Sequence, residues 1–184
     1  MYKNKKPIPR HINDFLDWLD VEKGLATKSQ ENYSRFIKKF TDWLKIADLE
    51  KLLPHDLSPE HVWKYRVYLS RNSKQPLKRS TQNYYLIALR ALLNYFAQRD
   101  ILSLPAEKIK LAKDKRERQI RFLTLDHLER LFAAPQVKTR DGKRDRAILE
   151  TLFSTGLRVA ELVNLNRSQI RPKSEPGELE LSII

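Results

Sequence analysis

The sequence predicts a mainly α-helical protein, in which a four-helix domain is followed by the beginning of a mixed α+β domain. Two observations lead to this fold class. Apolar residues recur at three- and four-residue spacing in four stretches between residues 8 and 100, the periodicity of amphipathic helices. Beyond a charged segment, shorter helical patterns give way to a strand-like alternation over residues 178–184. We therefore expect a helical domain over residues 1–104, a linker over 105–121 and a second domain over 122–184.

The first two expected helices are separated by a glycine. Residues 9–23 carry apolar side chains on one face, and Gly24 follows them as a C-cap, because glycine readily adopts the left-handed conformation that ends a helix. The second helix begins near Thr27 and has a basic face opposite its apolar stripe. That stripe consists of Tyr33, Phe36, Ile37, Phe40, Trp43 and Leu44.

Two further helices complete the first domain. Ser58 followed by Pro59 is a typical helix start, and Val62, Tyr65 and Leu69 are expected to point inward from that helix. The fourth helix begins at residues 79–81 and runs to about residue 99. Its apolar residues cover so wide an arc that we expect it at the centre of the bundle. They are Tyr85, Leu86, Leu89, Leu92, Leu93 and Phe96.

The expected linker, residues 105–121, lacks glycine and has more basic than acidic side chains. Such a composition favours an extended, hydrated segment. Two roles are open at this point: a plain tether between the domains, and a basic strap that clasps nucleic acid.

The second domain is expected to begin with a short helix capped by Thr124. Residues 141–142 (Asp-Gly) mark a turn, and a helix over residues 144–155 follows and ends at Gly156. Another short helix comes directly afterwards, over residues 158–164. Residues 172–177 then form a loop, and the strand at 178–184 has no expected partner, which leaves this domain unfinished.

The charge of the chain indicates a polyanionic partner. The sequence holds 36 Lys and Arg against 23 Asp and Glu, a net charge of +13. Each phosphate that such a protein neutralises releases condensed counterions, which favours nucleic-acid binding; a generally basic protein without such a ligand is the alternative. Cysteine is absent, which excludes disulfides and Cys-based sites and fits a cytoplasmic location. Neither an apolar run of membrane-spanning length nor a histidine cluster occurs, so we expect no membrane association, no metal and no cofactor.

The segment of greatest chemical interest is residues 155–162, TGLRVAEL. A helix ends at Gly156, a tight turn follows, and Arg158 stands at the start of the next helix with Glu161 one turn later. A helix start beside an arginine suits phosphate oxygens, because both supply N–H donors and positive charge. The residues alone leave two interpretations open: a phosphate-binding arginine held by Glu161, and an ordinary i, i+3 ion pair on a helix surface.

This segment resembles the stretch around the first catalytic arginine of the tyrosine recombinases, the phage-integrase and Xer-like family. Residues 121–124 resemble the opening of that family's catalytic domain, and residues 165–170 the segment leading into its sheet. The helical region resembles the family's SAM-like core-binding domain. The resemblance covers about residues 8–184 and implies a four-helix core-binding domain followed by the truncated start of an α+β catalytic domain.

The resemblance also implies a function, site-specific DNA recombination. In the family a tyrosine attacks a phosphodiester and forms a phosphotyrosyl link, while arginines stabilise the charge on the phosphate without a metal. Arg158 is then the first catalytic arginine and Glu161 its supporting carboxylate. The family nucleophile comes long after that arginine, whereas all seven tyrosines here precede Arg158. We therefore expect this chain to be a fragment that binds DNA and does not cleave it.

The expected partner is double-stranded DNA, and a full-length protein would assemble with itself or a paralogous recombinase in a tetrameric synapse. In the family the second and fourth helices face the duplex near their N-terminal ends. Basic and hydroxyl groups there suit phosphates, and Gln82 could reach a base edge. The resemblance also places Tyr84 where relatives often have a basic residue. The candidate DNA-binding residues are Lys28, Ser29, Asn32, Arg35, Lys78, Arg79, Thr81, Gln82 and Arg90, with Lys115 and Arg121 in the linker.

Two other functions are open from the sequence. A naturally truncated relative would act as a DNA-binding regulator without chemistry. A helical protein-interaction module would have an incidental basic charge and no affinity for DNA, and it would leave the match at residues 155–162 unexplained.

Overall fold

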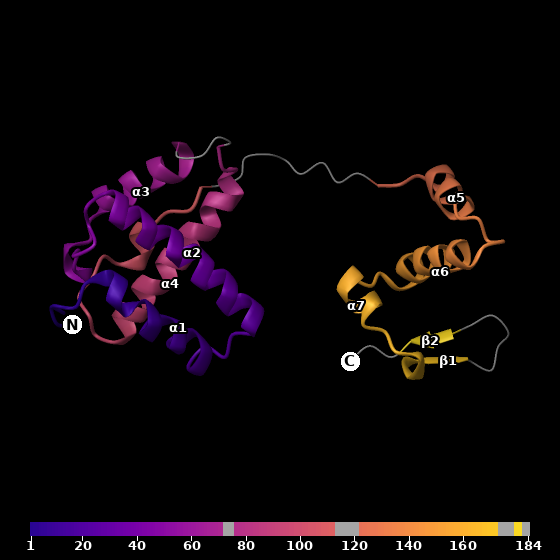
Figure 1. Ribbon diagram of the computed structural model, residues 1–184, viewed down its shortest axis with the longest axis horizontal. Coiled ribbons are helices and arrows are strands. Elements are labelled where there is room, and N and C mark those ends of the chain that lie inside the picture. The colour runs from indigo at the N-terminus through magenta and orange to yellow at the C-terminus, as the bar shows by residue number, and fades with distance from the viewer. Residues whose placement is uncertain (72–75, 113–121, 173–178, 182–184) are drawn as a thin grey trace. The chain divides into compact units, whose positions relative to one another are not determined.

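The computed structural model describes residues 1–71, 76–112, 122–172 and 179–181 (Figure 1). The chain divides into two compact units, residues 1–117 and 118–184. Described helices dominate both units, and the described strands form one short hairpin in the second. This confirms the expected fold class, which is mainly helical with a four-helix first domain.

The described part of the first unit is a bundle of four α-helices accompanied by short 3₁₀ turns. Its elements are a 3₁₀ turn at Ile8–His11, α1 (Ile12–Val21), α2 (Thr27–Ile46), a 3₁₀ turn at Pro54–Asp56, α3 (Pro59–Arg71), α4 (Arg79–Gln98) and a 3₁₀ turn at Ala106–Lys108. The N-terminus is tied to this unit, because Tyr2 exchanges backbone hydrogen bonds with residues 100 and 102.

Helix α4 lies at the centre of the bundle and packs against α1, α2 and α3, as its wide apolar arc predicts. Leu89, Leu92 and Phe96 have no exposed surface. The expected inward residues of α3, including Tyr65, are buried as well. Burial of one such side chain stabilises the fold by about 1.5–3 kcal/mol, so this contiguous core is the main source of the unit's stability.

The segment after α4 differs from the extended linker that the composition predicts. Ala106 and Ile109 are buried in the core of the helical unit. Asn83 of α4 donates to the carbonyl of Ala112 (2.9 Å) and accepts from its N–H (3.0 Å). Residues 105–112 therefore pack on the bundle, since Ala106 and Ile109 belong to its core and Leu111 packs against that core. The rest of the expected linker, residues 113–121, lies outside the described residues.

In the second unit, the residues that the structure describes form three α-helices and a hairpin. They are α5 (Leu125–Ala133), α6 (Arg140–Thr155), α7 (Val159–Val163), a 3₁₀ turn at Arg167–Gln169, β1 (Ile170–Pro172) and β2 (Leu179–Leu181). Thr124 caps α5 as expected, and Gly156 ends α6 in the left-handed conformation, with φ +67°. On α5, Leu128 and Phe132 are half-buried, whereas Leu131 is 40% exposed.

Two expectations for this unit are wrong. The Asp141–Gly142 pair is not a turn before the helix but part of the first turn of α6, which begins at Arg140 with Thr139 as its N-cap. A glycine suits this place because a Cβ on Gly142 would lie 2.0 Å from the carbonyl oxygen of Gln136. The strand near residue 180 also has a partner, since β2 pairs antiparallel with β1 and Ile170 stands opposite Leu181.

Candidate nucleic-acid interface

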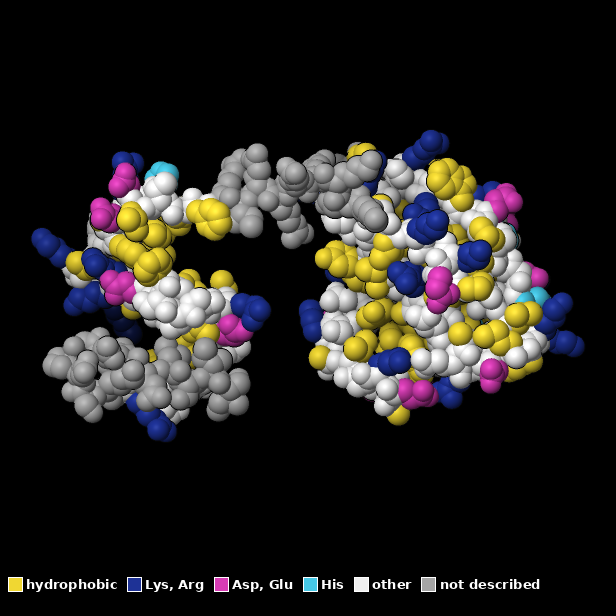
Figure 2. Space-filling model, turned by 180° about the vertical axis from the view of Figure 1, so that it is seen from behind, with side chains coloured by type: hydrophobic (Ala, Val, Ile, Leu, Met, Phe, Trp, Pro, Cys, Tyr) yellow, Lys and Arg dark blue, Asp and Glu magenta, His cyan; other side chains and the backbone are white. Residues whose placement is uncertain are grey.

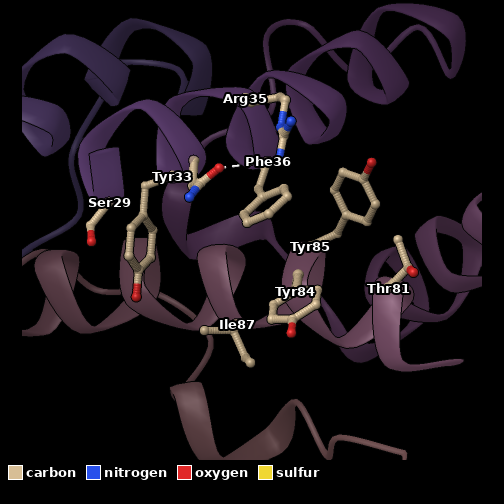
Figure 3. A pocket seen from close by; sticks show the side chains of 9 residues that line it. Ser29, Tyr33, Arg35, Phe36, Thr81, Tyr84, Tyr85 and Ile87 are labelled. Atoms are coloured by element: carbon tan, nitrogen blue, oxygen red, sulfur yellow. Dashed lines mark hydrogen bonds between the residues drawn. The ribbon is translucent and has the colours of Figure 1, made fainter. Parts of the chain in front are cut away.

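An open pocket lies between α2 and α4, on the surface of the helical unit (Figure 3). Its volume is about 770 Å³. The lining residues come from the first halves of the two helices: Ser29, Asn32, Tyr33, Arg35 and Phe36 from α2, and Thr81, Tyr84, Tyr85 and Ile87 from α4. None of these side chains is acidic, and they combine hydroxyl, amide and guanidinium groups with exposed apolar surface.

The starts of both helices favour an anionic ligand. Neither α2 nor α4 has an acidic residue in its first turn, so the positive end of each helix dipole is not neutralised there. Helix α4 contains no Asp or Glu at all. On α2, the carboxylate of Glu31 is paired with Lys28 at 2.7 Å. Figure 2 shows Lys and Arg side chains spread among hydrophobic ones over one face of this unit.

Aromatic contacts fix the two walls of the pocket relative to each other. The rings of Phe36 and Tyr84 are stacked, with centroids 5.8 Å apart and an interplanar angle of 12°. Tyr85 meets Phe36 edge-on at 5.3 Å. Such pairs contribute about 0.5–1.5 kcal/mol beyond area burial. The pocket is therefore a preformed surface, whose two walls are joined by packed rings.

The guanidinium of Arg35 is oriented by its neighbours on α2. It lies 5.1 Å from the centroid of the Phe36 ring and donates to the side-chain oxygen of Asn32 at 3.1 Å. An arginine in this position keeps further N–H donors for a ligand. Phosphate oxygens and base-edge acceptors are suitable partners for them.

The structure brings together four of the candidate DNA-binding residues that the sequence indicates. Ser29, Asn32, Arg35 and Thr81 all line the pocket. Other candidates do not line the pocket: Lys28, Lys78, Arg79 and Gln82 lie near the same helix starts, and Arg90 lies further along α4. The Gln82 amide donates to the carbonyl of Leu77 at 2.8 Å, so its N–H₂ group is engaged within the protein. Lys115 and Arg121 lie outside the described residues.

Sequence reasoning missed the apolar part of this surface. Tyr33, Phe36 and Tyr85 were assigned to core-facing stripes, yet they are half-buried and line the pocket. Ile87 was not singled out, although it follows Thr81 and Tyr84 at three-residue spacing along α4. That spacing is the signal that could have placed these three side chains on one face of the helix.

The arginine turn of the second unit has the geometry that its sequence indicates. Arg158 is the N-cap residue of α7, and its guanidinium donates to the carboxylate of Glu161 at 2.9 Å. The same carboxylate accepts from the backbone N–H of Arg158 at 2.7 Å. These two interactions with Arg158 hold the pKa of Glu161 below its ordinary value, so the carboxylate remains charged at neutral pH.

Arg158 is available to a ligand. Its side chain is 84% exposed, whereas that of Glu161 is 35% exposed. The ion pair engages one edge of the guanidinium, and the remaining N–H groups can donate to phosphate oxygens. Within the residues that the structure describes, no group of His, Asp and Glu could hold a metal ion. No helix of that part of the chain is long and apolar enough to span a membrane.

The fold and the site define a class of protein: a two-unit helical protein with a basic, preformed surface on one unit and an exposed arginine at a helix start on the other. Residues 12–100 match the family model of the phage integrase N-terminal SAM-like domain, and residues 121–178 match that of the phage integrase family. The two matches follow each other along the chain and together cover most of it.

Curated relatives agree with these matches. The chain is 33% identical over 160 residues to the tyrosine recombinase XerC of Pelotomaculum thermopropionicum, an alignment of 85% of this chain and 51% of the relative. It is 30% identical over 160 residues to the tyrosine recombinase XerD of Listeria monocytogenes, and this alignment covers 86% of the chain and 52% of the relative. The chain therefore belongs to the phage integrase family of tyrosine recombinases, and it spans about half the length of the curated relatives it matches.

Proposed function

We propose that this chain binds duplex DNA through the α2–α4 pocket surface. The observation that carries the proposal is the convergence of Ser29, Asn32, Arg35 and Thr81 on one acid-free, open surface. Those residue types donate to phosphates and to base edges, and the helix starts add positive potential. The net charge of +13 supports a polyanionic partner of this kind.

The protein to which these residues belong is proposed to be a site-specific recombinase that cleaves and rejoins DNA through a phosphotyrosyl intermediate. In that reaction Arg158 would donate to the non-bridging oxygens of the scissile phosphate and stabilise the charge that develops on them. Glu161 would act as a positioning residue, since its carboxylate holds the Arg158 backbone and guanidinium together. The exposure of Arg158 supports this role, because a phosphate could approach it directly.

The nucleophilic tyrosine is proposed to lie outside these 184 residues. Tyr65 and Tyr95 are buried in the helical unit, and Tyr33 and Tyr85 are half-buried there. We propose that the chain by itself binds DNA without cleaving it, in the cytoplasm. The complete protein would act in a tetrameric synapse with itself or with a paralogous recombinase.

The binding proposal is tested by fluorescence anisotropy with a labelled duplex of about 30 base pairs at several salt concentrations. Binding that weakens steeply with salt is expected, because each neutralised phosphate contributes about 0.9 to the slope of log K against log salt. Replacing Arg35 with alanine is expected to weaken binding and to reduce that slope by about one. No binding to any duplex at low salt would overturn the proposal.

A matched control separates the pocket from general charge. Lys51 is exposed in the loop after α2, beyond the opposite end of that helix from the pocket. The Lys51→Ala variant removes the same charge as Arg35→Ala and is expected to keep the salt slope of the unaltered chain. Equal losses in the two variants would show that binding is not localised at the pocket.

The chemical part of the proposal has its own test. Incubation of the chain with a nicked duplex that traps phosphotyrosyl products is expected to give no covalent complex on a denaturing gel. A covalent complex would show that one of the seven tyrosines is the nucleophile and would overturn the proposal that the nucleophilic tyrosine lies outside these 184 residues.

A further inference from the structure

The wall of the pocket that α4 contributes carries exposed apolar surface beside the hydroxyl of Thr81. Tyr84 is 56% exposed and Ile87 is 36% exposed, although both are large hydrophobic side chains. They follow Thr81 at intervals of three residues, and all three line the pocket. The Phe36 ring stacks on Tyr84 and still leaves both side chains open to the pocket. A phosphate backbone would gain little from such a surface, so phosphate binding does not account for this wall.

The wall that α2 contributes carries more hydrogen-bonding groups, beside the rings of Tyr33 and Phe36. Ser29, Asn32 and Arg35 also recur at intervals of three residues, and each carries hydrogen-bonding groups. The two walls meet where Phe36 of α2 stacks on Tyr84 of α4, at 5.8 Å. Figure 3 shows side chains of both helices converging at this place. A ligand in the pocket would therefore meet hydrogen-bonding groups, most of them from α2, and exposed apolar groups from Tyr84 and Ile87 of α4.

One part of a duplex offers that combination. The edge of an A·T pair in the major groove presents hydrogen-bonding groups of adenine and, beside them, the C5-methyl group of thymine. The major groove is also wide enough to admit an α-helix. An apolar peptide or a second copy of the chain would suit the α4 wall, but the basic, acid-free surroundings favour the polyanion.

We propose that the α4 wall of the pocket reads thymine methyl groups, with Ile87 and Tyr84 as the residues that determine specificity. The inference rests on the proposed DNA binding and adds to it a preference for A·T pairs, set by apolar contacts. Asn32 and Arg35 of the facing wall would donate to base edges or phosphates of the same site. Ile87 makes the cleaner test of the two, because Tyr84 also holds the ring of Phe36.

The experiment compares two duplexes that differ only in the methyl group. One is an alternating A·T duplex of about 30 base pairs, and the other has deoxyuridine in place of every thymidine. Anisotropy titrations of the whole chain are carried out with both at one low salt concentration. Burial of one methyl group corresponds to about fourfold in affinity, so two contacts predict a preference for the thymine duplex on the order of tenfold.

Variants assign the preference to the α4 wall. Ile87→Ala is expected to reduce the thymine-to-uracil ratio by about fourfold, because it weakens binding of the thymine duplex more than binding of the uracil duplex. Arg35→Ala is expected to weaken both duplexes equally and to keep the ratio. The matched control is Ile46→Ala, because Ile46 is 64% exposed at the far end of α2 and does not line the pocket. This variant should keep both affinities.

The outcomes separate this inference from the proposed function. Equal affinities for the two duplexes, with binding intact, would overturn methyl reading and leave DNA binding standing. An unchanged ratio in Ile87→Ala would overturn the assignment to α4. Binding to neither duplex would overturn the proposed function itself. Self-association of the chain that disappears in Ile87→Ala, measured by sedimentation without DNA, would show that the wall is an interface between copies instead.

Discussion

Replacing Tyr65 with phenylalanine is expected to stabilise the helical unit, although the change removes an atom from a fully buried side chain. Tyr65 has no exposed surface and lies among Phe40, Trp43 and Tyr68, with ring centroids at 5.0, 5.3 and 6.3 Å. Its hydroxyl makes no hydrogen bond within the described residues. Burial raises the pKa of this phenol, so the group is neutral at any ordinary pH.

The magnitude follows from the two effects of the substitution. An unsatisfied buried hydroxyl costs about 1–3 kcal/mol, and phenylalanine removes that cost. The ring contacts remain, and the space left by one oxygen atom offsets part of the gain, because cavities are destabilising. We expect a net increase of about 1 kcal/mol in the free energy of unfolding, which corresponds to a rise of roughly 4 °C in Tm.

Urea unfolding followed by tryptophan fluorescence measures this change, since Trp43 contacts Tyr65 directly. Tyr68→Phe is the matched control, because Tyr68 is half-buried in the same cluster and its variant is expected to stay within about 0.5 kcal/mol of the unaltered chain. A loss of 1 kcal/mol or more in Tyr65→Phe would refute the reasoning, because it would mean that the hydroxyl has a partner in solution.

Three further predictions concern other parts of the chain. Burial lowers the pKa of His11 from 6.5, so the stability that its neutral form contributes should be present above pH 6.5 and decline as the pH falls below it. The free energy of unfolding should therefore be lower at pH 5 than at pH 7.5, and the His11→Gln variant should lack this decrease. Asn83→Ala removes both hydrogen bonds to Ala112 and should lower stability by about 1–2 kcal/mol, with faster amide exchange at Ala112; unchanged exchange there would contradict the packing of residues 105–112. Gly142→Ala should destabilise the second unit by about 1–3 kcal/mol despite the better helix propensity of alanine, because the new Cβ would meet the backbone of Gln136; circular dichroism melting that shows a gain would count against this close approach.

The amino-acid sequence determined those features that depend on neighbours along the chain. The spacing of apolar residues placed α4 at the centre of the bundle, because a helix that is apolar over a wide arc must be covered on several sides. Gly24 and Gly156 marked helix ends and adopt positive φ angles there. The arginine turn followed as well, since Arg158 and Glu161 are three residues apart and meet on one helix face.

Only the tertiary structure decided which surfaces face each other. Periodicity gives the apolar face of each helix but not the angle at which two helices cross. The sequence therefore could not predict that Tyr33, Phe36 and Tyr85 line a surface pocket instead of being fully buried in the core. Gly142 is needed because the backbone of Gln136 lies too close for a Cβ atom. The Asp-Gly pattern alone gives no information about that close approach. Likewise, Asn83 holds a segment 29 residues further along the chain, and contacts of that range arise from packing rather than from local sequence.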